Sequence, residues 1–283
     1  MCELLDLLHL GRPEVVGVYL LEAPEPALVD CGPSTCMDTL ERELAWRGLR
    51  VGDLRHLYLT HVHFDHAGCA GSLVRANPRL LVHVSEIGAP HMIDPSRLES
   101  SARRVTGAEF DRVWGAVVPV PADNVRPLED RVNGLRVLPT PGHAKHHVAF
   151  VSADGDCFAG DSAGVRISPA ELVVPPAPPP DVDVEAWLSS LDRIAAATPA
   201  RLCLAHFGVF EDVEAHLERM RARLLEWVEL VRGGVSEDAF AEARAEELER
   251  EVAPPLVAAY AQAAPSRHTF AGLRRYVERA AAR

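Results

Sequence analysis

The sequence predicts a β-rich α/β body followed by a helical tail, and two observations lead to this prediction. Up to residue 208, short apolar runs of strand-forming residues alternate with helical segments and turns. From about residue 209 onward, almost every segment has the apolar periodicity of a helix and is rich in Ala, Glu and Arg. We therefore divide the chain into a body at 1–208 and a helical extension at 209–283.

The N-terminal half of the chain contains the apolar runs expected of four strands, at 15–21, 27–30, 54–60 and 80–84. Ser34 can cap a helix that runs to Gly48, because the segment offers an approximate apolar face of Met37, Leu40, Leu44 and Trp46. Residues 96–115 look helical and would form an insertion between strands.

Turn signals organise the rest of the body. Asn133-Gly134 marks a hairpin that leads into a strand at 135–138, and Asp154-Gly155 joins strands at 148–151 and 157–159. The stretch 175–180 holds five prolines in six residues, so it must be an extended loop. A helical stripe follows from Val184 to Ile194, and 202–205 is the last strand expected. Pro254-Pro255 and Pro265 divide the tail into separate helices.

Bulk properties exclude several classes of protein. The net charge of −12 disfavours a nucleic-acid binder, which needs a basic footprint for phosphates. No apolar run approaches the roughly 20 residues that span a membrane, so no membrane partner is expected. The first residues are acidic and lack the basic start of a signal peptide, which predicts a cytoplasmic protein. The six cysteines are scattered, as expected of reduced and mostly buried thiols.

Four side chains of metal-binding type follow the strand at 54–60, namely His61, His63, Asp65 and His66. Positions i and i+2 after a strand project to one side, so His61 and His63 can form half of a tetrahedral zinc site. Asp65 and His66 come as the chain turns and can serve a second cation. Because burying so many ionisable groups without a metal would be costly, the cluster predicts a metal site.

Three further candidates follow other predicted strands. His143 lies in a loop placed by Pro141 and Gly142, Asp161 comes after the strand at 157–159, and His206 follows the strand at 202–205. A carboxylate such as Asp161 can bridge two cations. Each residue alone is weak evidence, but their shared position at strand ends would let them converge on one rim.

The pattern His61-x-His63-x-Asp65-His66, then His143, Asp161 and His206, resembles that of the metallo-β-lactamase superfamily. The resemblance runs from residue 15 to about 207 and implies an αββα sandwich of two mixed β-sheets flanked by helices, with residues 1–208 as the catalytic domain. It gives one divalent ion to His61, His63 and His143 and a second to Asp65, His66 and His206, with Asp161 bridging. Zn²⁺ is the first choice, with Mn²⁺ or Fe²⁺ as alternatives. The chain is similar to a poorly characterised prokaryotic branch related to the glyoxalase II and lactonase groups.

Departures from other branches narrow the function that the resemblance implies. β-Lactamases with a histidine-rich site usually lack an aspartate at the position of Asp161, and RNA-processing members carry basic surface that this acidic chain lacks. Flavodiiron members have Glu in place of His63. Persulfide dioxygenases share many of these residues but use one iron, so they stay an alternative.

We therefore expect a metal-dependent hydrolase that attacks an activated carbonyl, in a thioester or lactone, of a small-molecule substrate. Two cations sharing a water lower its pKa, which makes hydroxide available near neutral pH. The leaving group can be stabilised by the second metal or protonated by Asp65. The alternatives are a mononuclear iron persulfide dioxygenase, a phosphodiesterase, and a non-enzymatic protein that kept the fold. The helical extension could add homodimer contacts.

Several residues near these motifs have plainer interpretations. One of His146 and His147 should face the site, whereas Lys145 should be solvated. Cys69, Tyr19 and Tyr58 should be packing residues, and no special role is expected for His9, His56, His83, His91, His216 and His268. The tail takes the place of the helical glutathione-binding segment of glyoxalase II-like enzymes. Within it, Arg274, Arg275 and Arg279 are the best candidates for an anionic group, although a solvated face is preferred. Residues 96–115 could act as a lid.

Overall fold

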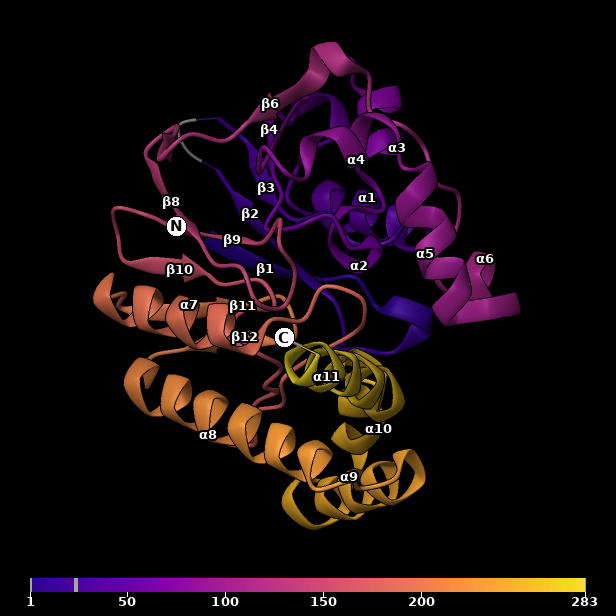
Figure 1. The fold of residues 1–283 in the computed structure, drawn as a ribbon. Coiled ribbons are helices and arrows are strands. Elements are labelled where there is room, and N and C mark those ends of the chain that lie inside the picture. Colours follow the sequence, from indigo (N-terminus) through magenta and orange to yellow (C-terminus); the bar gives the residue numbers. More distant parts are fainter. Residues whose placement is uncertain (1, 23–24, 283) are drawn as a thin grey trace. The chain divides into compact units, whose positions relative to one another are not determined.

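The computed structural model describes residues 2–22 and 25–282, which form two compact units, one ending at Asn133 and one beginning at Gly134 (Figure 1). Each unit is built on a mixed β-sheet that carries helices, which confirms the predicted fold class. No helix within the described residues has both the length and the apolar character needed to cross a membrane. The boundary predicted at residue 208 stays a prediction.

The sheet of the first unit has the order β1-β2-β3-β4-β5-β6. Its strands are β1 (Cys2–Asp6), β2 (Gly17–Leu21), β3 (Ala27–Val29), β4 (His56–Tyr58), β5 (Leu81–Val84) and β6 (Val125–Pro127). The first two pairings are antiparallel, and β3, β4, β5 and β6 run parallel. All four strand runs predicted in this half are confirmed. The parallel pairing brings the carboxyl ends of β3 and β4 to the same edge of the sheet.

The helices of the first unit are short. They are α1 (Met37–Trp46), α2 (Phe64–Ala67), α3 (Ala70–Ala76), α4 (Ala89–Ile93), α5 (Ser96–Thr106) and α6 (Phe110–Val113), with 3₁₀ turns at His9–Gly11, Ser34–Cys36, Val51–Asp53, Gly107–Glu109 and Ala122–Asn124. The helical insertion predicted at 96–115 is therefore confirmed. Helix α5 buries none of its side chains fully, but Phe110 at the start of α6 is buried.

The prediction that Ser34 caps a helix is wrong. Helix α1 begins at Met37, after a 3₁₀ turn, and Ser34 Oγ lies 2.8 Å from the carbonyl oxygen of Gly68 and 2.6 Å from that of Ala116. The hydroxyl therefore joins distant loops in place of capping the local backbone. Leu40 and Leu44 are buried as predicted, whereas Trp46 is 90% exposed, so the apolar face of α1 is narrower than expected.

The sheet of the second unit contains the strands β12-β11-β10-β9-β8 in that order, and the two-residue β7 (Arg131–Val132) ends the first unit. The strands are β8 (Leu135–Pro139), β9 (Val148–Val151), β10 (Asp156–Phe158), β11 (Arg201–Leu204) and β12 (Gly208–Phe210). The β9–β10 hairpin is confirmed, and β10 and β11 pair in parallel. The strand at 202–205 is not the last one, because β12 follows it and pairs antiparallel. Three residues beginning with Gly carry too little pattern to predict a strand.

Five helices complete the described part of the second unit: α7 (Val184–Ala196), α8 (Val213–Arg232), α9 (Glu237–Glu251), α10 (Pro254–Ala263) and α11 (Ser266–Ala281). Pro254 opens α10 and Pro265 precedes α11, which confirms the predicted division of the tail. The proline-rich stretch 175–180 contains no helix or strand, also as predicted. Helix α11 packs against α8 and α9, and α8 packs against α7.

A buried histidine makes the stability of the first unit sensitive to acid. His83, in β5, has its Nε2 3.0 Å from Nδ1 of His56 in the neighbouring strand β4. Burial, together with the nearby His56 and Arg126, lowers the pKa of His83 from 6.5 to about 4. As the pH falls, protons therefore bind the unfolded chain before they bind the folded one.

As the pH falls from about 6.5 to about 4, we expect this histidine to lower the free energy of unfolding by on the order of 2 kcal/mol. Below about pH 4 it should cause no further loss. Urea unfolding of the metal-free wild type and of His83→Gln across this range measures the effect. Glutamine keeps a hydrogen-bonding group but does not titrate, so the curve of the variant should be flatter. Equal pH dependence in both proteins would contradict the prediction.

Candidate metal centre

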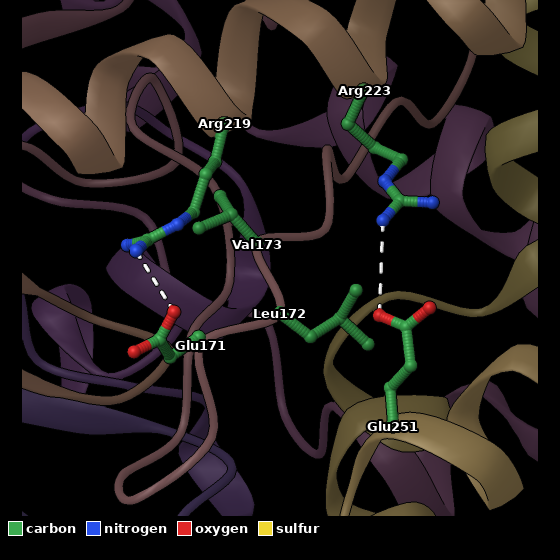
Figure 2. Close-up of a pocket in the computed structure, with 6 residues that line it drawn as sticks. All are labelled: Glu171, Leu172, Val173, Arg219, Arg223 and Glu251. Carbon is green, nitrogen blue, oxygen red and sulfur yellow. Dashed lines mark hydrogen bonds and ion pairs between the residues drawn. The ribbon is translucent and has the colours of Figure 1, made fainter.

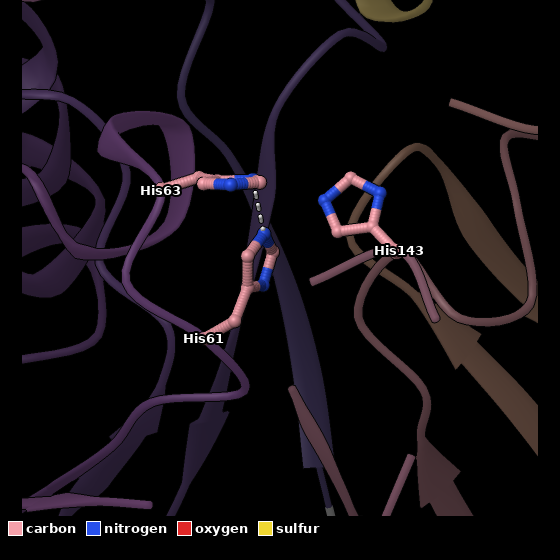
Figure 3. Close-up of side chains that lie close together, drawn as sticks. All are labelled: His61, His63 and His143. Atoms are coloured by element: carbon pink, nitrogen blue, oxygen red, sulfur yellow. Dashed lines mark hydrogen bonds between the residues drawn. The ribbon is translucent and has the colours of Figure 1, made fainter. Parts of the chain in front are cut away.

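In the first unit, the predicted ligands follow strand β4. His61 is fully buried, and its Nε2 lies 3.0 Å from Nδ1 of His63 (Figure 3). Two nitrogens bound to one tetrahedral zinc at about 2.0–2.1 Å would lie roughly 3.3 Å apart. The two histidines thus present nitrogen atoms at about the separation that one metal ion requires, and their predicted convergence is confirmed.

A buried carboxylate, Asp30, orients the ring of His66. Its Oδ2 lies 2.8 Å from His66 Nδ1, and its Oδ1 accepts a hydrogen bond from the backbone N–H of Thr60 at 2.8 Å. Because an ionised carboxylate only accepts, Nδ1 of His66 carries the hydrogen and Nε2 keeps the lone pair that a metal needs. This is the usual arrangement of a metal-binding histidine held by an outer carboxylate.

The same carboxylate also controls His61, through Thr60. The Thr60 hydroxyl donates to Asp30 Oδ2 at 2.8 Å, so its oxygen is left to accept from His61 Nδ1, which lies 3.1 Å away. The lone pair of His61 is then on Nε2. One buried carboxylate therefore fixes which nitrogen each of two predicted ligands can offer to a metal.

Asp65 and Phe64 belong to the short helix α2, and their side chains have different surroundings. The Asp65 side chain is 22% exposed, and its Oδ2 lies 3.9 Å from His66 Nε2. Phe64 is buried and packs edge-on against Phe110, with ring centroids 5.6 Å apart. The helical insertion is thus attached directly to the residue between two predicted ligands, and its role as a lid stays a prediction.

In the second unit, Asp161 lies between two imidazoles. Its Oδ2 is 3.3 Å from Nε2 of His143, and its Oδ1 is 3.4 Å from Nε2 of His206. All three side chains are buried. Asp161 follows β10 and His206 follows β11, so the parallel pairing of these strands brings them to the same sheet edge. A carboxylate with one oxygen toward each of two ligands has the orientation expected of a bridge between two cations.

The hydrogen bond of His143 shows that these donors suit a cation. Its Nδ1 lies 2.7 Å from the carbonyl oxygen of Pro176, which can only accept, so Nδ1 carries the hydrogen. The lone pair of a neutral His143 on Nε2 then faces a carboxylate oxygen of Asp161 at 3.3 Å. Two acceptors at this distance repel each other unless a positive charge lies between them, and a bound metal ion would supply that charge.

A glycine lets this loop approach helix α7. Gly142 has φ +140, and a Cβ added there would lie 2.3 Å from the Cα of Trp187. The Trp187 ring packs edge-on to His143, with centroids 5.6 Å apart, and its Nε1 donates to the carbonyl of Ser162. Close packing of α7 therefore restricts the His143 ring from the side.

Of the adjacent pair His146 and His147, the second contacts the centre. His147 Nδ1 lies 2.8 Å from Thr140 Oγ1, and its Nε2 accepts a hydrogen bond from the backbone N–H of Asp161 at 3.1 Å. Lys145 is 65% exposed and pairs with Asp181 at 3.1 Å, as expected of a solvated lysine. Cys69, Tyr19 and Tyr58 are buried packing residues, as predicted.

The second unit has a surface concavity in which the positive and negative side chains balance (Figure 2). It is lined by Glu171, Leu172, Val173, Arg219, Arg223 and Glu251. Arg219 pairs with Glu171 at 2.9 Å, and Arg223 lies 4.0 Å from Glu251 and also pairs with Glu247. Each guanidinium thus meets a carboxylate. This concavity is poorly suited to an anionic substrate group.

Comparison with known proteins identifies the family. The family model of the metallo-beta-lactamase superfamily matches residues 12–206. The chain belongs to this superfamily. The resemblance found in the sequence is confirmed, and this superfamily binds divalent metals through clusters of His and Asp side chains. The seven side chains assigned above are of that kind, and their division between two ions stays a prediction.

Individual metallo-β-lactamase superfamily proteins match most of the chain. The protein ST1585 of Sulfurisphaera tokodaii is 28% identical over 241 residues, covering 79% of this chain and 85% of that protein. The crystal structure of TTHA1429 from Thermus thermophilus matches with a TM-score of 0.69 and 25% identity, over 99% of this chain and 94% of that one.

Two further superfamily relatives bear on the chemistry. The structure of TTHA1623 in a di-iron-bound form matches with a TM-score of 0.53 and 30% sequence identity. The match covers 71% of this chain and 92% of that one. A hydroxyacylglutathione hydrolase of Cupriavidus taiwanensis is 31% identical over 140 residues, which is 48% of this chain and 44% of that enzyme. The chain thus spans less than half of the length of this last relative.

The sequence did not reveal Asp30 and Pro176 as partners of the predicted ligands. Asp30 directly follows β3, and an acidic residue at the end of a strand is a local signal for such a partner. For Pro176 there was no such signal, because a backbone carbonyl can come from any residue.

We expect Asp30→Asn to weaken metal binding by about 10–100-fold, because the variant loses the charge that orients His66 and His61 and raises their basicity. Competition with a chromophoric chelator for Zn²⁺ measures the affinity. Asp38→Asn, an exposed position on α1, is the control and should bind like the wild type. Wild-type affinity in Asp30→Asn would show that this carboxylate does not act on the ligands.

Proposed function

We propose that this chain is a dinuclear metal-dependent hydrolase that cleaves a thioester or a lactone of a small-molecule substrate. The observation that carries the proposal is the carboxylate of Asp161, whose oxygens face His143 and His206 separately. A carboxylate oriented in this way suits a bridge between two cations. The proposal also includes a cytoplasmic location, and a homodimer is compatible with it.

In this proposal one ion is held by His61, His63 and His143, the other by Asp65, His66 and His206, and Asp161 bridges them. When bound, the two ions would supply a water of lowered pKa for attack on the carbonyl and positive charge for the developing oxyanion. Within the protein, Asp30 and the carbonyl of Pro176 hold ligand rings in the required tautomers.

Asp65 is the residue to which we assign the proton of the leaving group. Its side chain is 22% exposed, whereas that of Asp161 is 4% exposed, so Asp65 can exchange a proton with solvent more readily. Thioesters and lactones suit this chemistry, because their carbonyls are activated and their leaving groups, a thiolate or an alkoxide, can be stabilised by a cation or by a proton.

The relatives support the substrate class and the metal count. A hydroxyacylglutathione carries its acyl group on sulfur, and the enzyme from Cupriavidus taiwanensis named for it resembles about half of this chain. The di-iron form of TTHA1623 supports a two-metal centre and keeps Fe²⁺ beside Zn²⁺ and Mn²⁺ as a candidate ion.

We expect the purified chain to bind about two equivalents of Zn²⁺, Mn²⁺ or Fe²⁺ and then to hydrolyse members of a panel of acyl-glutathione thioesters and lactones. Elemental analysis gives the metal count, and release of thiol or acid gives the rate. One iron per chain, with oxygen uptake on a persulfide, would support the dioxygenase alternative. Cleavage of phosphodiesters alone would replace the carbonyl substrate class.

We expect Asp161→Asn to retain about one metal ion per chain and to hydrolyse its substrate roughly 100-fold or more slowly, because an amide is a poor bridge between two cations. Asp156→Asn is the matched control, since Asp156 is a buried carboxylate of the same sheet that pairs with Arg201 at 2.6 Å. The control should be less stable but keep both ions. Full metal content and full activity in Asp161→Asn would refute the bridging role.

A further inference from the structure

The last helix, α11, contacts the proline-rich segment 175–180 at Ala177. Gly272 faces this residue so closely that an added Cβ would lie 2.0 Å from the carbonyl oxygen of Ala177. One turn earlier, the hydroxyl oxygen of the buried Thr269 lies 3.4 Å from the backbone nitrogen of Ala177. Both backbone polar groups of Ala177, which is fully buried, therefore meet α11.

The composition of the segment explains why it needs this support. Five of its six residues are prolines, which have no N–H, so Ala177 is the one residue of 175–180 that can donate a backbone hydrogen bond. Such a segment cannot pair along its length with a neighbouring strand. Its conformation depends on groups supplied from outside.

Two arginines on α11 supply further contacts. The carbonyl of Pro180 accepts from Arg275 Nε at 3.3 Å and from an Arg279 terminal nitrogen at 3.5 Å, and a second Arg279 nitrogen donates to the carbonyl of Val182 at 2.7 Å. The contact positions on α11 are 269, 272, 275 and 279, which follow the spacing of a single helix face. These donors bind the protein backbone, so Arg275 and Arg279 have a structural use other than holding an anionic substrate group.

The held segment carries the carbonyl that orients His143. Pro176 directly precedes Ala177, and its carbonyl oxygen is 2.7 Å from His143 Nδ1. We propose that α11 is a positioning element for the metal ligand His143: through Ala177 and Pro180 it fixes the Pro176 carbonyl, which fixes the tautomer and direction of the imidazole. This inference rests on the proposed function only in that His143 binds a metal ion.

The contacting positions are therefore positioning residues, and the helical extension is part of the metal centre's framework. A ring that loses its carbonyl partner can rotate or exchange tautomers, and its metal then binds less tightly. Partners of this outer kind change metal affinity by about 10–100-fold when they are removed.

The test uses the full chain and three variants on α11. Gly272→Ala pushes on the Ala177 carbonyl, and Arg279→Met removes the donor to Val182 and one of the two donors to Pro180. Arg274→Met is the matched control, because Arg274 lies on the same helix but pairs with Glu278 at 3.7 Å and packs over Phe270. Zinc affinity is measured by chelator competition, and the free energy of unfolding of the metal-free protein is measured in parallel.

We expect Gly272→Ala and Arg279→Met to bind zinc at least about tenfold more weakly than the wild type, and Arg274→Met to bind it normally. Folded Gly272→Ala and Arg279→Met proteins that keep wild-type zinc affinity would overturn the proposal, even if both are less stable. Should Gly272→Ala fail to fold, Arg279→Met against Arg274→Met decides the question.

A second readout does not depend on metal binding. In metal-free protein labelled with ¹⁵N-histidine, NMR should find a His143 ring protonated at Nδ1, and this signal should change in Arg279→Met but persist in Arg274→Met. If the wild type binds no metal yet shows this pattern, the proposed function fails while the positioning role stands. If the wild type binds metal and the His143 ring signals of the wild type, Arg279→Met and Arg274→Met are alike, the positioning role fails.

Discussion

Parallel strand pairing is the constraint on which the candidate ligands of each unit depend. In the first unit β3 and β4 run parallel, so Asp30 and the Thr60-His61 pair emerge side by side at one edge of the sheet. In the second unit β10 and β11 do the same for Asp161 and His206. The pairing of the backbone strands thus positions these polar groups without the help of a metal ion. The cost of burying them is offset by hydrogen bonds and, in our proposal, by the charge of the ions.

The ligand rings differ in the chemistry of the groups that orient them. His66 is held by the carboxylate of Asp30, and His61 is linked to the same carboxylate through a hydroxyl. His143, in contrast, is held by the neutral carbonyl of Pro176. A carboxylate makes an imidazole a stronger donor than a carbonyl does, so the ligands of the first unit should be the more basic ones.

The appendages of the fold attach close to the ligands. The helical insertion packs Phe110 on Phe64, which lies between His63 and Asp65 in the chain. Helix α11 contacts the segment that orients His143. In folds that host many functions, specificity comes from such additions to a common framework. Here the helical insertion and α11 contact residues next to the predicted ligands. Substitutions in these two segments can therefore alter the chemistry as well as the access of substrates.

The sequence by itself determined the candidate metal ligands, the family and most of the elements, because these leave local signals. Four metal-type side chains within six residues, strand runs with turn residues between them and a helical tail divided by prolines can all be read from neighbouring positions. Short or irregular features leave no such signal: β12 begins with Gly208 and is too brief for a pattern, and the Ser34 hydroxyl bonds the carbonyls of distant residues.

Only the tertiary structure decided how the candidate ligands are oriented. Asp30 and His66 are 36 residues apart, and His143 and Pro176 are 33 apart, so neither pair follows a helix or strand period. The contact of α11 with the proline-rich segment joins positions 92 residues apart. Hydrogen bonds across such separations depend on how the chain packs, and packing is set by many residues at once. The sequence therefore determined which groups could bind a metal, and the folded structure decided which nitrogen of His61, His66 and His143 is presented to it.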